Sequence, residues 1–342
     1  MNQPQPTAPI RVTIAVVVYN GERYLSAALE SALAQTHRDI EVLVVDDGST
    51  DGSVELVRGF CRRSSRVRFH RHERNLGIGA AMRTCVGLVA TEWFVILEQD
   101  DLLLPDCVAR QLAVLAAFPE AAVISGRAHL IDESGKRIGA AYHAPMTVAR
   151  LRELVERCEP PEMVNPGSLV HRPSVLAVGN YREELRRFGQ DLDMVARLAE
   201  GGYRLVNHDG FVVENRVHGL SSTFSLGPWI WAVAPWQAAR MRCRRELRPE
   251  PSWEEFLRDL DGRPALTRLA FWRGLLLKHL YWRARLAAGQ GGWPGVAWRL
   301  ALAFCLSPRF VWDLAWRKVS ARLDRPPGQP LPRDAGEGAP DK

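Results

Sequence analysis

Three short strand-like runs, each followed by a segment of helical spacing, constrain the fold more than any other feature of the sequence. Residues 10–18 (IRVTIAVVV), 40–45 (IEVLVV) and 93–98 (WFVILE) are mainly β-branched or apolar, as in strands buried on both faces. Apolar residues recur at helical spacing between them, for example over residues 24–33. This alternation predicts an α/β fold with a mostly parallel, doubly wound sheet.

Beyond residue 100 the pattern becomes less regular. The sequence DESGK (132–136) predicts a hairpin, and helices are expected near residues 147–157, 173–178 and 191–200. The segments YRLVNH (203–208) and FVVENRV (211–217) predict two short strands. Helical spacing dominates the last third of the chain.

Charge and tryptophan are unevenly distributed along the chain. Between Arg263 and Arg325 twelve Lys and Arg stand against two acids, although the whole chain carries only +6. Ten of the eleven tryptophans lie at or beyond Trp229. We therefore expect a flexible N-terminus (1–9), an α/β domain (10–225), a basic, Trp-rich helical region (226–325) and a disordered tail (326–342).

Several classes of protein are disfavoured by the sequence. No apolar run reaches about 18 residues, so no membrane-spanning helix is expected, and the N-terminus has no secretory pattern. The six cysteines are scattered without a CxxC pair, which argues against a disulfide framework or a zinc site and favours the reducing cytoplasm.

Acidic residues follow two of the predicted strands. Asp46 and Asp47 end one strand, and Glu98, Asp100 and Asp101 end another. Ligands of open α/β sheets bind beyond the carboxyl ends of strands, and Mg²⁺ or Mn²⁺ held by carboxylates can in turn hold a diphosphate. The alternative is a simple turn at residues 47–49 with a helix cap at Asp51. No GxGxxG follows the first strand and no P-loop motif is present.

These motifs resemble those of the family 2 glycosyltransferases. The segment VTIAVVVYNGERYLSAALESALAQTHRDIEVLVVDDGSTDGS is similar to the opening signature of that family, and residues 75–101 resemble its N-x-G…A-R-N…D-x-D-D stretch. The resemblance covers residues 10–222 and implies the GT-A fold, a doubly wound sheet of the nucleotide-diphospho-sugar transferase type, here with a helical C-terminal extension.

The resemblance implies contacts to the nucleotide sugar. Tyr19 and Asp47 would contact the nucleotide, with Asp47 at the base, and Val17 would add backbone contacts. The arginine of the A-R-N motif is replaced by Met82, and the neighbouring Arg83 is the candidate substitute. On a helix, however, Arg83 points about 100° away from Met82.

The resemblance also implies a metal site. Asp100 and Asp101 occupy the metal and ribose-diphosphate positions, so that Asp100 would contact both the metal and the nucleotide sugar. Glu98 replaces the first acid of D-x-D with a longer arm and is a candidate ligand of the nucleotide sugar. The segment ENRVHGLSS (214–222) resembles the R-x-H-x-x-S-x-S element of the family, which makes His218 a candidate ligand of the metal or diphosphate. The implied cofactor is Mg²⁺ or Mn²⁺.

The segment GQDLDMVARL (189–198) resembles the E-D-x-D…R-L element, whose second acid is the general base. That acid corresponds to Asp191, with Gln190 in place of the preceding glutamate. The alternative makes Asp191 a helix N-cap and Asp193 a surface acid.

The implied reaction is inverting, metal-dependent transfer of a sugar from a nucleotide sugar to an acceptor hydroxyl, in synthesis of surface polysaccharide or glycolipid. Glu98, Met82 and Gln190 motivate a second hypothesis, a non-catalytic glycosyltransferase-like protein that binds nucleotide sugar or serves as a scaffold at the membrane. A nucleotidyltransferase is a third hypothesis, but no triphosphate-binding loop follows the first strand.

The basic, Trp-rich region admits two interpretations. It is either a helical subdomain packed on the catalytic core, or a set of interfacial helices on an anionic membrane surface. The second fits a glycan or lipid-linked acceptor and a cytoplasmic protein peripheral to the inner face of the membrane. No recognised module supports binding of nucleic acid.

Overall fold

The computed structural model describes residues 10–141, 143–219, 227–289 and 293–307. Within them the chain forms two compact units. The first comprises the residues up to His129 together with 141–155 and 161–216, and the second comprises 130–140, 156–160 and the chain from Val217 onward. The N-terminus (1–9) and the tail (326–342), expected to be flexible and disordered, lie outside the described residues.

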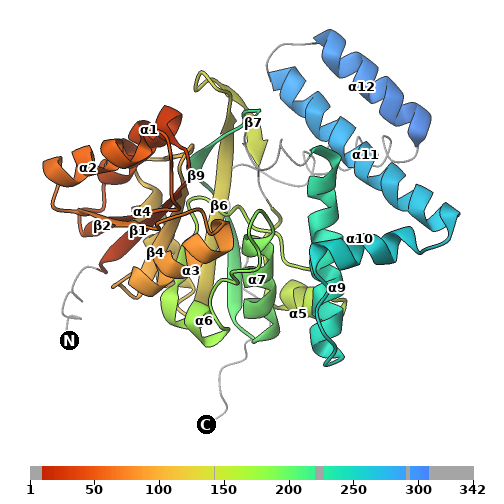
Figure 1. The fold of residues 1–342 in the computed structure, drawn as a ribbon, viewed down its shortest axis with the longest axis horizontal. Helices are drawn as coiled ribbons and strands as arrows, with labels where there is room; N and C mark the ends of the chain where they lie inside the picture. Colours follow the sequence, from red (N-terminus) through yellow and green to blue (C-terminus); the bar gives the residue numbers. More distant parts are fainter. Residues whose placement is uncertain (1–9, 142, 220–226, 290–292, 308–342) are drawn as a thin grey trace, which may run out of the picture. The chain divides into compact units, whose positions relative to one another are not determined.

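One half of the sheet has the parallel arrangement that the sequence predicts (Figure 1). Its strands lie in the order β3-β2-β1-β4, and all three pairings are parallel. Their bounds are β1 (Val12–Val18), β2 (Ile40–Asp46), β3 (Val67–Arg71) and β4 (Trp93–Glu98). The doubly wound expectation is therefore confirmed for the strands that carry the acidic motifs.

The other half of the sheet is mixed. Here β8 (Leu169–His171) lies antiparallel to both β4 and β6 (Ala121–Ile131), and β5 (Leu102–Leu103) lies antiparallel to β9. The order continues β4-β8-β6-β9-β5, and β7 (Arg137–Ala141) forms the predicted hairpin with β6. Within the described part of the chain the sheet has nine strands.

The prediction of two strands at 203–217 is wrong, because one strand, β9 (Arg204–Arg216), runs through Asp209-Gly210. Gly210 does not form a turn here. A Cβ at Gly126 of β6 would lie 2.6 Å from the Gly210 carbonyl oxygen, so glycine is needed where the two backbones approach closely.

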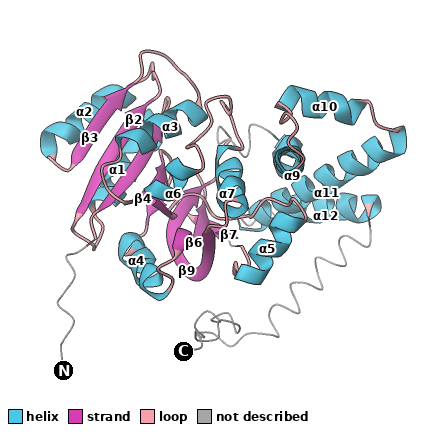
Figure 2. Ribbon diagram, turned by 90° about the horizontal axis from the view of Figure 1, so that it is seen from below, coloured by secondary structure: helices cyan, strands magenta, loops and turns pink. Residues whose placement is uncertain are grey.

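Helices cover both faces of the sheet, because both faces of its parallel strands are apolar (Figure 2). On one face Ile14 and Val16 of β1 belong to a core shared with three helices, and on the other Ala15 belongs to a core shared with four. The first set is α1 (Glu22–Leu33), α2 (Ser53–Arg63) and α4 (Cys107–Ala117); the second is α3 (Ile78–Leu88), α5 (Val148–Glu156), α6 (Arg172–Ala177) and α7 (Gln190–Glu200).

The second unit is mainly helical and has an aromatic interior. Its helices are η1 (Gly227–Ala232), α9 (Val233–Arg245), α10 (Trp253–Asp261), α11 (Ala265–Gly289) and α12 (Trp293–Leu306). Trp253 contacts Trp229, Trp236 and Phe256 with ring centroids 5.3–6.1 Å apart. Much of the tryptophan excess is thus explained by packing within this unit. Across the described residues, no helix combines the length and the hydropathy needed to cross a bilayer.

Gly79 of α3 allows the segment before α7 to approach closely, and this generates a stability prediction. A Cβ at Gly79 would overlap the Arg182 carbonyl oxygen and lie 2.7 Å from that of Leu185. Because both obstacles are backbone, we expect Gly79→Ala to lower the free energy of unfolding by about 1–3 kcal/mol. Thermal denaturation measures the effect as a fall of several degrees in Tm.

Gly87 on the same helix is the matched control. Nothing lies within 4 Å of a Cβ at Gly87, so Gly87→Ala should leave stability unchanged or raise it by roughly 0.5–1 kcal/mol. Equal behaviour of the two variants would contradict the close packing at Gly79.

Candidate active site

The parallel pairing brings the carboxyl ends of three strands to one edge of the sheet. Val17 of β1 lies in register with Val45 of β2 on one side and with Glu98 of β4 on the other. The two acidic motifs of the sequence therefore flank the end of β1. Val17 itself is half-buried.

Glu98, Asp100 and Asp101 gather at the end of β4, where each offers a carboxylate oxygen within 4.8 Å of the others. The strand β5 follows at once and pairs with β9, so that Leu102 is opposite Glu214. This register places the next residues of β9 beside Asp101.

Arg216 and Asn215 of β9 hold the acidic cluster. The backbone N–H of Arg216 donates to Asp101 Oδ1 at 2.7 Å, and Asn215 Nδ2 donates to Asp101 Oδ2 at 2.9 Å. Arg216 Nε also donates to the carbonyl oxygen of Asp100 at 3.0 Å. Asp101 is fully buried and is thus fixed by donors on both oxygens.

The electrostatics of the cluster reflect crowding of like charges. The Glu98 side chain reaches solvent, yet loss of hydration among the surrounding protein atoms raises its pKa to about 7, with contributions from the charges of Asp100 and Asp191. Burial, then Glu98 and Asp100, raises the pKa of Asp101 well above its ordinary value. Carboxylates that repel one another in this way are suited to bind a divalent cation, because a hard cation prefers oxygen ligands and its charge relieves their repulsion.

Asp191 lies close enough to this cluster for its charge to raise the pKa of Glu98. It is the second residue of α7, and Asn165, Tyr181 and Asp191 line a cavity of about 30 Å³, with room for a water molecule or two. Asn165 Nδ2 donates to Glu98 Oε1 at 3.1 Å, which connects the cavity to the cluster. Burial raises the pKa of Asp191.

The structure contradicts the alternative interpretation of the GQDLD segment. The N-cap of α7 is Gly189, and no side chain caps the helix. Asp193 is fully buried rather than on the surface. Its carboxylate pairs with Arg197 at 2.7 Å and Arg182 at 3.7 Å, because a buried charge requires partners.

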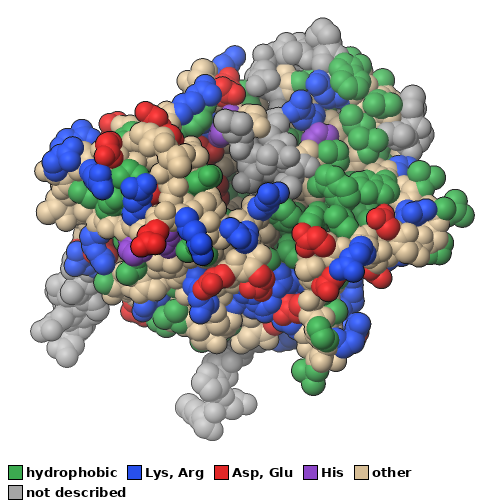
Figure 3. All heavy atoms as spheres, in the orientation of Figure 1, with side chains coloured by type: hydrophobic (Ala, Val, Ile, Leu, Met, Phe, Trp, Pro, Cys, Tyr) green, Lys and Arg blue, Asp and Glu red, His purple; other side chains and the backbone are tan. Residues whose placement is uncertain are grey.

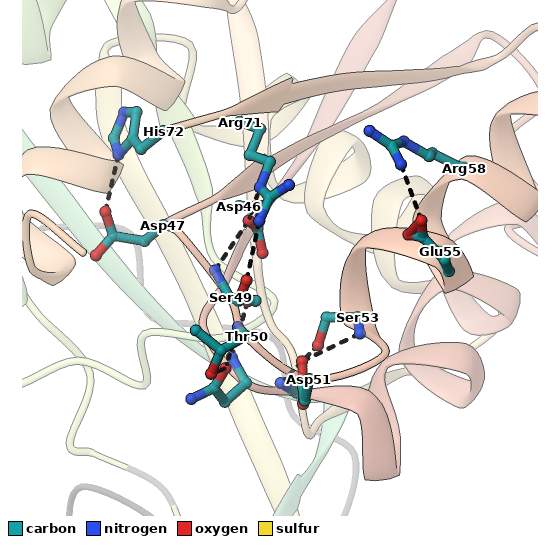
Figure 4. A network of polar contacts seen from close by, with 12 residues as sticks. Asp46, Asp47, Ser49, Thr50, Asp51, Ser53, Glu55, Arg58, Arg71 and His72 are labelled. Atoms are coloured by element: carbon teal, nitrogen blue, oxygen red, sulfur yellow. Dashed lines mark hydrogen bonds and ion pairs between the residues drawn. The ribbon is translucent and has the colours of Figure 1, made fainter. Parts of the chain in front are cut away.

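Asp47 is held on the far side of the site by a network that the sequence did not predict (Figure 4). Its Oδ1 accepts from the backbone N–H of Leu76 at 3.0 Å and contacts His72 Nδ1 at 2.8 Å, and its Oδ2 accepts from Gly77 N–H at 2.8 Å. His72 Nε2 in turn contacts Thr84 Oγ1 at 3.0 Å. The turn at residues 47–49 is present, with Ser49 N–H donating to Asp46, but the Asp47 carboxylate faces the loop that begins α3.

Tyr19 and Arg83 differ in their exposure and in their hydrogen bonds. The Tyr19 backbone forms two hydrogen bonds with the Gln99 side chain, while 44% of the residue is exposed. Arg83 donates to the carbonyl oxygens of Gly179 and Tyr181, both at 3.1 Å, and pairs with Glu183. Arg83 therefore supports the loop before α7, and its contact with a nucleotide sugar stays a prediction.

Met82 and His218 are not among the residues that form the acidic cluster. Met82 is buried in the apolar core of the first unit. His218 is half-buried and belongs to the second unit. Among the described residues, the cluster that could hold a metal ion consists of Glu98, Asp100 and Asp101. The role of His218 at a metal therefore stays a prediction.

Sequence reasoning missed five residues of this arrangement: His72, Asn165, Tyr181, Asn215 and Arg216. Asn215 and Arg216 lie in the segment 214–222 that made His218 a candidate, so the resemblance of that segment could have pointed to them. Asn165 and Tyr181 stand in irregular loops, where no spacing marks a functional side chain.

Residues 13–175 match the family model described as glycosyl transferase family 2. An uncharacterized glycosyltransferase of Rickettsia felis is 32% identical over 183 residues, which are 53% of this chain and 29% of that protein. Chondroitin synthase of Escherichia coli is 35% identical over 135 residues, which are 40% of this chain and 20% of that protein. The matched region therefore spans under a third of either relative.

Solved structures resemble the fold over most of the chain. S. aureus TarS 1-349 in complex with UDP-GlcNAc has a TM-score of 0.55 at 14% identity, covering 85% of this chain and 90% of that one. Mannosyltransferase PcManGT from Pyrobaculum calidifontis, in complex with GDP-Man and Mn²⁺, has a TM-score of 0.52 at 19% identity, covering 94% and 85%.

The sheet, its acidic edge and these likenesses define the GT-A fold of nucleotide-diphospho-sugar transferases. Within that fold, residues 13–175 belong to glycosyl transferase family 2.

The raised pKa of Glu98 generates a pH prediction for the metal-free protein. The folded state binds the Glu98 proton more tightly than the unfolded state does, since the pKa rises from 4.5 to about 7 on folding. The free energy of unfolding should therefore fall as pH rises through this window. In Glu98→Gln this contribution is absent, so the variant should gain stability relative to wild type as pH increases.

Thermal denaturation in chelator across that window measures the difference. Adding Mn²⁺ should raise the Tm of wild type most at the upper end, because only ionised carboxylates bind a cation. The exposed Glu254→Gln is the control. If wild type and Glu98→Gln changed in parallel with pH, the crowding of charge at the end of β4 would be refuted.

Proposed function

We propose that this protein is an inverting, metal-dependent glycosyltransferase. It transfers a sugar from a nucleotide-diphosphate sugar to a hydroxyl of a glycan or lipid-linked acceptor, in synthesis of cell-surface polysaccharide or glycolipid. The supporting observation is that Asp191, in a cavity with Asn165, stands close enough to the acidic cluster for its charge to raise the pKa of Glu98.

Asp191 is the proposed general base. A base that removes the proton of an acceptor hydroxyl works best when its pKa lies closer to neutrality, and burial raises the pKa of Asp191 in that direction. One protein carboxylate suffices, because the leaving diphosphate needs charge stabilisation rather than a proton. Attack from the face opposite the leaving group gives inversion.

Glu98, Asp100 and Asp101 are the proposed ligands of Mg²⁺ or Mn²⁺, with His218 as a further candidate. A divalent cation bound there neutralises the charge that develops on the diphosphate. Asn215 and Arg216 keep Asp101 in place, and Asn165 orients Glu98. Restraint of this kind matters because ligand orientation governs metal affinity.

Tyr19, Asp47, Val17 and Arg83 are the proposed nucleotide-sugar contacts. Val17 lies near the end of β1 and Asp47 directly follows the neighbouring β2, at the same edge of the sheet, and Tyr19 comes two residues after Val17. The exposed Tyr19 ring offers a surface for stacking. UDP-GlcNAc and GDP-mannose, named in the structural neighbours, are the first donors to test.

A second candidate function is a non-catalytic nucleotide-sugar-binding or scaffold protein. The observation that favours it is the position of Arg83 and Met82: one supports a loop and the other lies in the core. Arg83 is therefore engaged by protein groups and Met82 carries no charge, so neither residue provides a free cation to bind a diphosphate. Donor-dependent release of nucleoside diphosphate separates this candidate from an enzyme.

Asp191→Asn should reduce transfer roughly 10²–10⁴-fold while donor binding stays close to wild type, because the amide cannot accept the proton. Release of nucleoside diphosphate measures turnover, and calorimetry measures donor binding. Asp261→Asn, an exposed charge loss in the second unit, is the control. Wild-type turnover in Asp191→Asn would reject the assignment of the base.

Asp100→Ala should weaken Mn²⁺-dependent binding of nucleoside diphosphate by at least the roughly 10–100-fold that loss of an outer-shell partner costs. Asp100 is preferred to the buried Asp101, whose removal would leave Asn215 and Arg216 without an acceptor. Titration calorimetry with and without metal gives the affinity, and Asp106→Asn at the start of α4 is the control. Unchanged affinity and metal dependence would place the diphosphate elsewhere.

The proposed location is the cytoplasm, peripheral to the inner face of the membrane. This location would bring the donor site to a lipid-linked acceptor.

A further inference from the structure

An open apolar groove lies on the second unit, between η1 and α11. Its volume is about 650 Å³. Its walls include Trp229, Leu266, Leu269, Trp272 and Leu276, and Arg273 is the charged residue of its lining. An exposed apolar groove of this size is typical of a surface that binds a partner.

The helix α11 presents apolar residues on two sides. Leu275, Leu277 and Leu280 are buried within the structure. By contrast, Leu266 is 81% exposed, Leu269 is 65% exposed and Leu276 is 37% exposed. The spacing of these three exposed leucines places them along one stripe of the helix, so this stripe is available to a partner.

Aromatic packing makes the base of the groove rigid. Trp272 of α11 meets Trp229 of η1 edge-on, with ring centroids 4.3 Å apart. Trp229 and Phe271 extend the contact toward Trp253 and Phe256. The leucines are therefore held in place on an ordered base, which lowers the entropic cost of inserting them into a partner.

The helix α11, which forms one wall of the groove, carries only basic charges. From Ala265 to Leu306 the sequence contains no Asp or Glu, while basic residues recur through α11. Arg273 and Lys278 are exposed, and neither has an ion-pair partner among the described residues. Figure 3 shows a broad area of apolar side chains over α10 and α11, with both basic and acidic side chains at its margins.

We propose that this groove and the basic residues of α11 dock the protein on an anionic lipid bilayer. The exposed leucines enter the interface between headgroups and acyl chains, and Arg273 and Lys278 meet lipid phosphates. A second copy of the chain is a poorer occupant, because the basic residues of two copies of α11 would repel each other. The proposal rests on the proposed function in one respect: it names the surface that brings the transferase to a lipid-linked acceptor.

Vesicle co-sedimentation of the full chain tests the apolar part of the proposal. Wild type should bind phosphatidylglycerol–phosphatidylcholine vesicles at low salt, bind phosphatidylcholine vesicles weakly and be partly released by salt, since attraction between exposed charges is screened. Leu266→Gln with Leu269→Gln should weaken binding at least about tenfold, because two exposed leucines no longer insert. Leu247→Gln, at a leucine 95% exposed but outside the groove, should bind like wild type.

The charged part is tested with a matched pair of double variants. Arg273→Gln with Lys278→Gln should weaken binding to anionic vesicles roughly tenfold or more and reduce its salt dependence. Arg62→Gln with Arg152→Gln removes the same charge from exposed positions of the first unit and should have little effect. Equal losses in both double variants would indicate net charge alone and overturn the assignment to the groove.

Three other results would also overturn the proposal. The first is that wild type does not bind anionic vesicles at low salt. The second is that the leucine double variant binds them with wild-type affinity. The third is that wild type is a dimer, the leucine double variant is a monomer, and neither binds vesicles. Mn²⁺-dependent binding of UDP or GDP, measured on the same samples without vesicles, reports on the proposed function separately. If wild type failed to bind vesicles but still bound the nucleotide, the docking surface alone would be refuted.

Discussion

Three carboxylates at the end of β4 repel one another, and the end of β9 holds them together. Arg216 provides most of this restraint: its backbone N–H binds Asp101, its side chain binds the carbonyl of Asp100, and its guanidinium lies 4.6 Å from the centre of the Tyr24 ring in α1. The acidic loop, the last residues of β9 and the first turn of α1 are therefore a single connected structure. Any ligand of the acids binds to an arrangement already formed.

The loop before α7 depends on a second set of arginines. Arg197 pairs with Asp193 and donates to the carbonyl oxygen of Val178, and Arg83 reaches the carbonyls of Gly179 and Tyr181 from α3. These contacts satisfy backbone oxygens that an irregular loop leaves without partners. They also position Tyr181 and the start of α7, and hence Asp191. Support for the proposed base thus comes in part from α3, through Arg83.

The parallel half of the fold and the acidic edge were predictable, because both depend on local signals. Continuous β-branched runs specify buried strands, and acids directly after them must lie at one edge. The antiparallel half was less predictable, since β5 has two residues and β9 runs through an Asp-Gly pair that normally marks a turn. The partners of the acids were not predictable, because Asn165 and Tyr181 reach the site only through tertiary packing. The tryptophan excess was informative about the second unit, although packing within that unit, rather than exposure, accounts for much of it.

The network around Asp47 has a consequence for selectivity. A carboxylate has four lone-pair directions, and His72, Leu76 and Gly77 already use three of them. One direction on Oδ2 is left, and it can only accept a hydrogen bond. A nucleobase that meets Asp47 must therefore present an N–H at that point, and a ring edge that offers a bare nitrogen or carbonyl is repelled. By occupying three lone pairs, His72, Leu76 and Gly77 leave the Asp47 carboxylate able to accept one further hydrogen bond.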